Sequence, residues 1–212
     1  IEAGRLELRT ERVNVRELVM EVTERTRRRR PTPTTRAVAV DIDDTIPETL
    51  RCDGERLAQV LSNLVDNALK FTTDGSVWIS AELVDEVGGE TRGAEGADGE
   101  STGAVASAAD ADGDGRGAET VASGTPAGPG DDTVAIRFSV DDTGPGIPEE
   151  YRERIFQLFT QGDSSRTRAH CGTGLGLALS RRLVRMMDSE LYVDSEVGVG
   201  SRFFFAARFP RG

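Results

Sequence analysis

A long low-complexity stretch at residues 85–132 constrains this 212-residue chain more than any other feature of its sequence. It holds half of the 24 glycines of the chain, with ten alanines, twelve acidic residues and only three bulky apolar residues, all valines. Such a composition buries too little apolar surface to offset the conformational entropy lost on ordering the segment. We therefore predict a disordered acidic insertion, with the fold built from the residues on either side of it.

Alternating apolar residues on both sides of the insertion predict strands. Residues 77–83 alternate before it and residues 134–140 alternate after it, so the insertion would join two neighbouring strands. The entropy cost of closing a loop grows only with the logarithm of its length, so a sheet tolerates a long insertion between two of its strands. Further strands are predicted at residues 37–42, 190–195 and 201–209.

Apolar residues at helical spacing predict three longer helices, one before the first of these strands and two between later ones. Asn14 and Asp53 are candidate N-caps of the first two, and the third is expected over residues 175–187. Pro148 opens a shorter helix that is expected to end near Phe159. The pattern as a whole predicts an α/β fold, namely a two-layer α/β sandwich in which a mixed sheet of about five strands is covered on one face by about three helices.

The composition argues against several classes of protein. The net charge is −11, of which residues 85–132 carry −10, and this net acidity argues against a nucleic-acid-binding protein, which would present a basic face. No apolar run approaches the ~18–20 residues that span a bilayer, so no membrane segment is expected. Cys52, Cys171 and the sole histidine, His170, do not have metal-ligand spacing, and reduced thiols in a cytoplasmic protein are expected.

Three polar residues share one face of the helix that Asp53 opens. Asn63, Asn67 and Lys70 lie at positions i, i+4 and i+7, opposite the apolar stripe of the same helix. An amide oxygen is a hard neutral ligand suited to Mg²⁺, and a lysine ammonium is a point charge suited to phosphate. Polar residues on a helix surface more often contact only solvent, so this pattern alone does not identify a site.

Two glycine-containing segments add to this pattern. Asp142, Gly144 and Gly146 follow a predicted strand, where glycines let a flat ligand approach the backbone and a carboxylate accepts a hydrogen bond from an exocyclic amine. Residues 172–177 open a helix with three glycines, and a helix N-terminus attracts anions such as phosphate. A plain surface turn and a glycine-rich helix start explain each segment equally well when it is considered alone.

In their order along the chain, these segments resemble the ATP-binding catalytic domain of sensor histidine kinases, in the ATPase superfamily shared with DNA gyrase and heat-shock chaperones. The resemblance runs from residue 1 to about residue 210, apart from the insertion. Five ordered motifs carry it: the N box at residues 63–72, the G1 box at 142–147, the F box at 155–159, the G2 box at 172–177 and a closing glycine motif at 198–203.

The resemblance implies roles for individual residues. Asn67 matches the residue that binds Mg²⁺, and Asn63, Asn67 and Lys70 match the catalytic residues. Asp142 matches the residue that accepts a hydrogen bond from the adenine amine. Residues 160–171 match a lid over the nucleotide. The residues implied to contact ATP are Asn63, Asn67, Lys70, Phe71, Asp142, Gly144, Gly146, Ile147, Phe159, Gly172, Thr173, Gly174, Leu175, Gly176, Leu177 and Ser201.

The resemblance also implies a function and partners. Residues 1–30 match the end of a dimerisation and phosphotransfer region with its connecting helix, and residues 31–212 match the kinase domain, interrupted by 85–132. The kinase would bind Mg·ATP and transfer the γ-phosphoryl group to a histidine on the upstream helical domain of a homodimer. A response regulator would then receive the group on an aspartate. The expected location is cytoplasmic, including the cytoplasmic portion of a membrane-anchored sensor.

Three alternatives stay open at the level of the sequence. A serine kinase of the anti-sigma-factor type would phosphorylate a separate protein, an ATPase would transfer the group to water, and a non-catalytic module would bind no nucleotide. Superfamily members that hydrolyse ATP place a glutamate as general base where this chain has Asn63, and an amide cannot take a proton from water. This favours a protein acceptor, with catalysis by positioning and charge neutralisation.

Overall fold

The structure is a computed structural model that describes residues 8–29, 36–85, 132–157 and 175–212. All but the two end residues of the predicted insertion, and the whole predicted lid, lie outside the described residues. The elements are β1 (Glu11–Val13), α1 (Val15–Arg29), β2 (Arg36–Ile42), β3 (Leu50–Cys52), α2 (Gly54–Phe71), β4 (Gly75–Val84), β5 (Thr133–Asp142), α3 (Glu149–Arg152), a 3₁₀ helix (Arg154–Phe156), α4 (Gly176–Met186), β6 (Tyr192–Glu196) and β7 (Gly200–Pro210).

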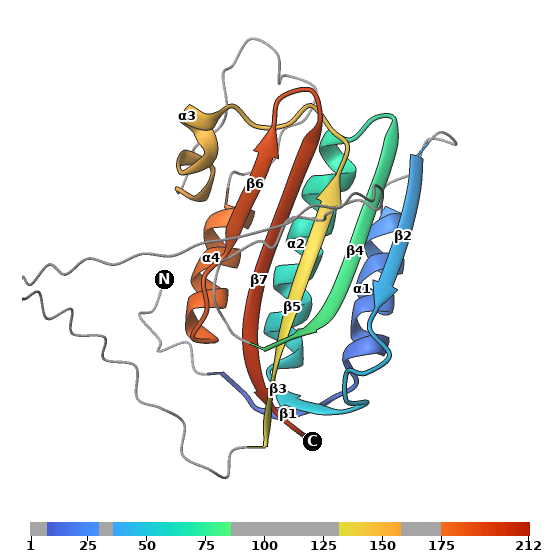
Figure 1. The fold of residues 1–212 in the computed structure, drawn as a ribbon, viewed down its shortest axis with the longest axis vertical. Coiled ribbons are helices and arrows are strands. Elements are labelled where there is room, and N and C mark those ends of the chain that lie inside the picture. Colours follow the sequence, from blue (N-terminus) through green and yellow to red (C-terminus); the bar gives the residue numbers. More distant parts are fainter. Residues whose placement is uncertain (1–7, 30–35, 86–131, 158–174) are drawn as a thin grey trace, which may run out of the picture. The chain divides into compact units, whose positions relative to one another are not determined.

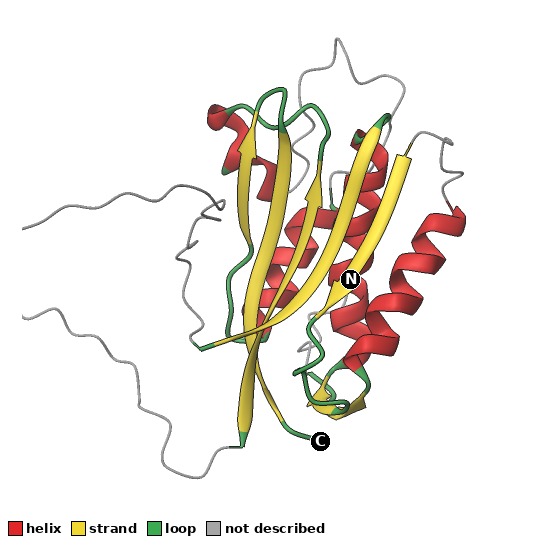
Figure 2. Cartoon of the chain, turned by 45° about the vertical axis from the view of Figure 1, so that its right-hand side comes forward, coloured by secondary structure: helices red, strands yellow, loops and turns green. Residues whose placement is uncertain are grey.

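Five strands form the main sheet, in the order β2-β4-β5-β7-β6. Strand β2 pairs with β4 in parallel and the other neighbours are antiparallel, so the sheet is mixed. Helices α1, α2 and α4 lie together on one face of it (Figures 1 and 2). The predicted two-layer α/β sandwich is therefore confirmed, with a separate two-stranded pair, β1 and β3, beside it.

Helix α2 lies at the centre of the helical layer, in contact with α1 on one side and α4 on the other (Figure 1). The Asp53 carboxylate caps its N-terminus, accepting hydrogen bonds from the backbone N–H groups of Arg56 at 2.9 Å and Arg9 at 2.8 Å. This satisfies one of the free N–H groups of the first helical turn. The buried stripe of α2, which faces the sheet, consists of Leu57, Val60, Leu61, Leu64, Val65, Ala68 and Leu69.

The strands supply the other half of the core through their alternate side chains. Phe138 of β5 stacks on Phe205 of β7, with ring centroids 5.3 Å apart, and meets Phe209 edge-on at 6.2 Å. Both Phe138 and Phe205 are almost fully buried. These contacts hold β5 and β7 in register at the middle of the sheet, and both strands lead to the segments that were predicted to form a site.

Two local features differ from the sequence prediction. The short helix that follows Pro148 stops at Arg152, and a 3₁₀ turn at residues 154–156 replaces its expected continuation toward Phe159. The tighter turn places the Phe156 ring edge-on against Phe203, with centroids 6.4 Å apart. The pair β1 and β3 was not predicted, because three residues are too few to show an alternating pattern.

Candidate functional site

Twelve of the sixteen predicted ATP-contacting residues lie in the described part of the chain. They come from α2, the segment after β5, the start of α4 and the start of β7. The end of β5, the C-terminal end of α2 and the start of β7 lie at the upper end of the sheet in Figure 1, whereas α4 starts lower down, beside the middle of α2. The four residues outside the described ranges are Phe159, Gly172, Thr173 and Gly174.

Asp142 lies at the end of the central strand β5 and joins this strand to α2. Its Oδ1 accepts a hydrogen bond from the Gly144 N–H at 2.8 Å and another from the Thr72 hydroxyl at 3.4 Å. Thr72 is fully buried and is the C-cap of α2. It follows Asn67 by five residues, or about 7.5 Å along a helix axis. The predicted carboxylate and the predicted metal-binding amide therefore both lie near the C-terminal end of α2.

The environment of Asp142 raises the pKa of its carboxyl group above the ordinary value for aspartate. Burial is the main cause, because it penalises the charged form. The hydrogen bonds from Gly144 and Thr72 act in the opposite direction, and the neighbouring charge of Asp141 adds to the rise. A half-buried carboxylate of this kind gains from a ligand that donates a hydrogen bond to it.

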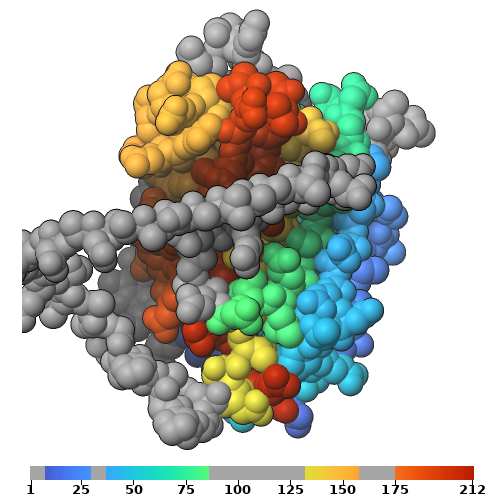
Figure 3. Space-filling view, viewed as in Figure 1, coloured from blue at the N-terminus to red at the C-terminus, as the bar shows by residue number. Residues whose placement is uncertain are grey.

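The segment after β5 packs backbone to backbone against the turn between β6 and β7, and the two lie side by side in Figure 3. Gly146 has a φ of +70°, and a Cβ there would come within 2.0 Å of the Glu196 carbonyl oxygen. Gly200 has a φ of +147°, and its Cβ would lie 1.9 Å from the carbonyl oxygen of Asp142. Larger residues are excluded at both positions, so these two glycines allow the turn to support the Asp142 segment.

Ser195 of β6 adds a side-chain link between the same two segments. Its Oγ accepts a hydrogen bond from the Ile147 N–H at 2.7 Å, donates to the Gly200 carbonyl at 2.8 Å and lies 2.9 Å from the Ser201 Oγ. Arg152 donates to the Ser195 carbonyl. Sequence analysis missed Ser195, because its role depends on the register that pairs it with Ser201.

The polar face of α2 points away from its buried stripe, as predicted. Asn63, Asn67 and Lys70 are all partly exposed. The Lys70 Nζ lies 4.8 Å from the centre of the exposed Phe71 ring. Asn67 is thus on the partly exposed side of the helix, where a ligand could reach its amide.

Asn63 connects α2 to the start of α4. Its Nδ2 donates hydrogen bonds to the Gly176 carbonyl oxygen at 3.2 Å and to the Ser180 Oγ at 3.1 Å. Next to Gly176, the predicted contact Leu175 is exposed, whereas Leu177 packs against the core. The Asn63 side chain thus joins α2 directly to α4.

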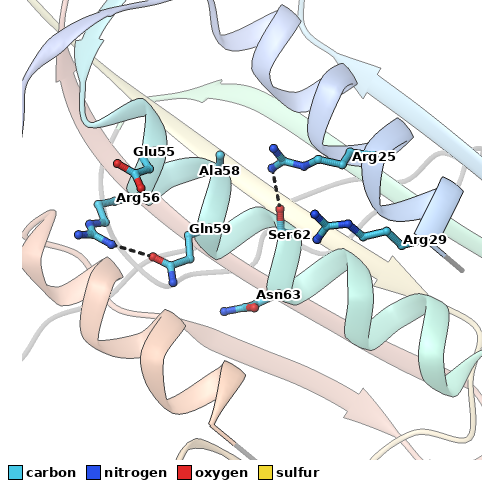
Figure 4. Close-up of a pocket in the computed structure, with 8 residues that line it drawn as sticks. All are labelled: Arg25, Arg29, Glu55, Arg56, Ala58, Gln59, Ser62 and Asn63. Atoms are coloured by element: carbon cyan, nitrogen blue, oxygen red, sulfur yellow. Dashed lines mark hydrogen bonds between the residues drawn. The ribbon is translucent and has the colours of Figure 1, made fainter. Parts of the chain in front are cut away.

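A separate groove of about 450 Å³ lies between α1 and α2 (Figure 4). None of the residues after β5 lines it, and Asn63 is the one predicted residue that does. In Figure 4 the Asn63 side chain points away from the arginines of α1. The groove therefore overlaps with the predicted site only at Asn63. Its lining residues are Arg25, Arg29, Glu55, Arg56, Ala58, Gln59, Ser62 and Asn63.

Comparisons with known proteins agree with the fold and the motifs. Residues 103–211 match the family model described as histidine kinase-, DNA gyrase B-, and HSP90-like ATPase. Histidine kinase 3 of Arabidopsis thaliana is 37% identical over 180 residues, which cover 82% of this chain and 17% of that protein. Sensor histidine kinase GacS of Pseudomonas protegens is 31% identical over 211 residues, which cover 100% of this chain, α2 included, and 18% of that protein.

A solved structure shows the same similarity in three dimensions. Full-length ShkA in complex with AMPPNP superposes with a TM-score of 0.68 and 28% identity, over 99% of this chain and 33% of that one. The chain thus spans less than a fifth of the two kinases named above and a third of ShkA. No helix among the described residues has the length and apolar character needed to cross a membrane.

The glycine contacts lead to a prediction about stability. Gly200→Ala is expected to lower the free energy of unfolding by about 3–5 kcal/mol, since it combines an unfavourable φ with a clash against the Asp142 backbone. Gly198→Ala is the matched control, because Gly198 has a φ of +85° but nothing within 4 Å of its added Cβ. It should cost only about 1–2 kcal/mol. Equal losses in urea denaturation would contradict the proposed backbone contact.

The raised pKa of Asp142 leads to a prediction about pH. The folded chain holds the Asp142 proton to higher pH than the unfolded chain, so this group lowers stability as pH rises through the interval between the two pKa values. Asp142→Asn keeps the oxygen that accepts from Gly144 and Thr72 but removes the charge. The variant should gain stability relative to the unaltered chain from about pH 4 upward. A difference in unfolding free energy that is constant with pH would refute this.

Proposed function

Because the chain belongs to the histidine kinase-, DNA gyrase B- and HSP90-like ATPase family, we propose that it binds Mg·ATP where Asp142 meets the end of α2. It is a catalytic ATPase domain related to histidine kinases. One observation carries the site assignment. The contacts Thr72–Asp142 and Asn63–Gly176 join three motif-bearing segments, widely separated in sequence, along the C-terminal half of α2.

The adenine end of the site is proposed to lie at Asp142. Its carboxylate would accept a hydrogen bond from the exocyclic amine of the base. This would replace part of the hydration that burial removes. At Gly144 an added Cβ would lie 2.6 Å from the Asp142 Oδ1, so a glycine keeps the carboxylate accessible. Ile147 and Ser201, held by Ser195, would line the same end.

The phosphate end of the site is proposed to lie along the polar face of α2, with the glycines that precede α4. No group of three or more histidine, cysteine, aspartate or glutamate side chains in the described residues is arranged to hold a metal. The amide oxygens of Asn63 and Asn67 are the groups here that could ligate a metal, and the Lys70 ammonium could pair with phosphate. Two amides fit Mg²⁺ that arrives with a triphosphate, because Mg²⁺ keeps several phosphate and water oxygens and needs few protein ligands. Bound there, Mg²⁺ would neutralise charge on the phosphates.

The proposed reaction is transfer of the γ-phosphoryl group to a histidine of an upstream helical domain in a homodimer, for relay to a response-regulator aspartate. Residues 1–30 would connect that domain to the kinase domain, residues 31–212, with α1 packed on α2. Asn63 supports transfer over hydrolysis, because an amide whose nitrogen donates to α4 cannot act as a general base. We place the reaction in the cytoplasm.

The metal assignment is tested by Asn67→Asp. A carboxylate in place of the amide would put a negative charge beside the triphosphate, so the affinity for Mg·ATP in calorimetry should fall at least about tenfold, with the fold unchanged by circular dichroism. Gln59→Glu is the matched control. It makes the same change two turns earlier on α2, in the groove near Arg56, and should leave the affinity within about twofold. Unchanged affinity for Asn67→Asp would show that the assignment is wrong.

The acceptor is tested with γ-labelled ATP. The 212-residue chain should bind ATP without becoming labelled or releasing phosphate. A longer protein that includes the upstream helical domain should acquire acid-labile, base-stable label, as expected for phosphohistidine. Steady phosphate release by the chain alone would instead identify a hydrolase. Acid-stable label on a separate protein would identify a serine kinase.

A further inference from the structure

Ser180 of α4 has a contact that the motif assignments do not explain. Its side chain is fully buried, and its Oγ accepts a hydrogen bond from the Asn63 Nδ2 at 3.1 Å. The two residues lie 117 positions apart in the sequence. A buried hydroxyl that meets an amide at the edge of the candidate site is expected to influence that amide.

The two contacts of Asn63 determine which end of its amide faces α4. The Gly176 carbonyl oxygen can only accept a hydrogen bond, so the nitrogen of the amide must face it, at 3.2 Å. Ser180 lies one helical turn after Gly176, on the same face of α4, and accepts from the same nitrogen. With the nitrogen held by two acceptors, the Asn63 oxygen is directed away from α4.

We propose that Ser180 is a positioning residue for the phosphate end of the site. Through Asn63 it fixes the orientation of an amide on the same face of α2 as Asn67, and it holds the start of α4 against α2. This inference rests on the proposed binding of Mg·ATP. It adds that the buried Ser180 hydroxyl, as the second acceptor beside the Gly176 carbonyl, strengthens the hold on the Asn63 nitrogen and so on the direction of the Asn63 oxygen.

A double-mutant cycle distinguishes this role from a structural one. Ser180→Ala removes one neutral hydrogen bond, so the affinity for Mg·ATP should fall about three- to tenfold in calorimetry. In the Asn63→Ala background the same substitution should change the affinity less than twofold, because Ser180 would have no amide left to orient. Ser180→Cys fills the same site with a slightly larger group that is a weaker acceptor, so it should resemble Ser180→Ala.

Ser62→Ala is the matched control, because Ser62 precedes Asn63 on α2 but contacts Arg25 on the α1 side. It should leave the affinity within about twofold. Two outcomes overturn the proposal: no loss with either Ser180 variant, or equal losses with and without Asn63, which would assign Ser180 to packing of α4. If the unaltered chain does not bind Mg·ATP, the proposed function is wrong. If it binds Mg·ATP but one of these two outcomes is found, only the role of Ser180 is wrong.

Discussion

The amphipathic geometry of α2 is the constraint on which the rest of the structure depends. A helical repeat of 3.6 residues places leucines and valines on the sheet and leaves Asn63, Asn67 and Lys70 on the outer side of the same helix. The packing that stabilises the fold therefore also sets the spacing of the polar side chains. A shift of α2 along the sheet would expose part of its buried stripe and would move Thr72 away from Asp142.

The second requirement is close approach of backbone segments, which glycine permits. The turn between β6 and β7 supports the chain after β5 through contacts that leave no room for a Cβ at Gly146 or Gly200. Such contacts position Asp142 without using the side chain that a ligand would need. Loops placed in this way by a rigid sheet are a common location for binding residues.

Sequence patterns predicted the five main strands and three main helices, because each element is long enough to show its period. Asp53 was identified as a cap from its residue type and position alone, and its hydrogen bonds confirm it. Short elements such as β1 and β3 lack that signal. Contacts across the fold, such as Asn63 with Ser180 or Ser195 with Ile147, depend on helix packing and strand register, which no local pattern encodes.

The electrostatics of the site also follow from its packing. Burial of Asp142 disfavours its charged form, and the hydrogen bonds of Gly144 and Thr72 only partly offset that cost. A ligand amine that donates to the carboxylate would offset more of it, so part of the binding energy would come from reducing the cost of burying that charge. At the other end, neutral amides avoid the repulsion that carboxylates would exert on a triphosphate. The chain thus places the half-buried Asp142 carboxylate where a donor is expected and keeps amides and an ammonium where negative charge is expected.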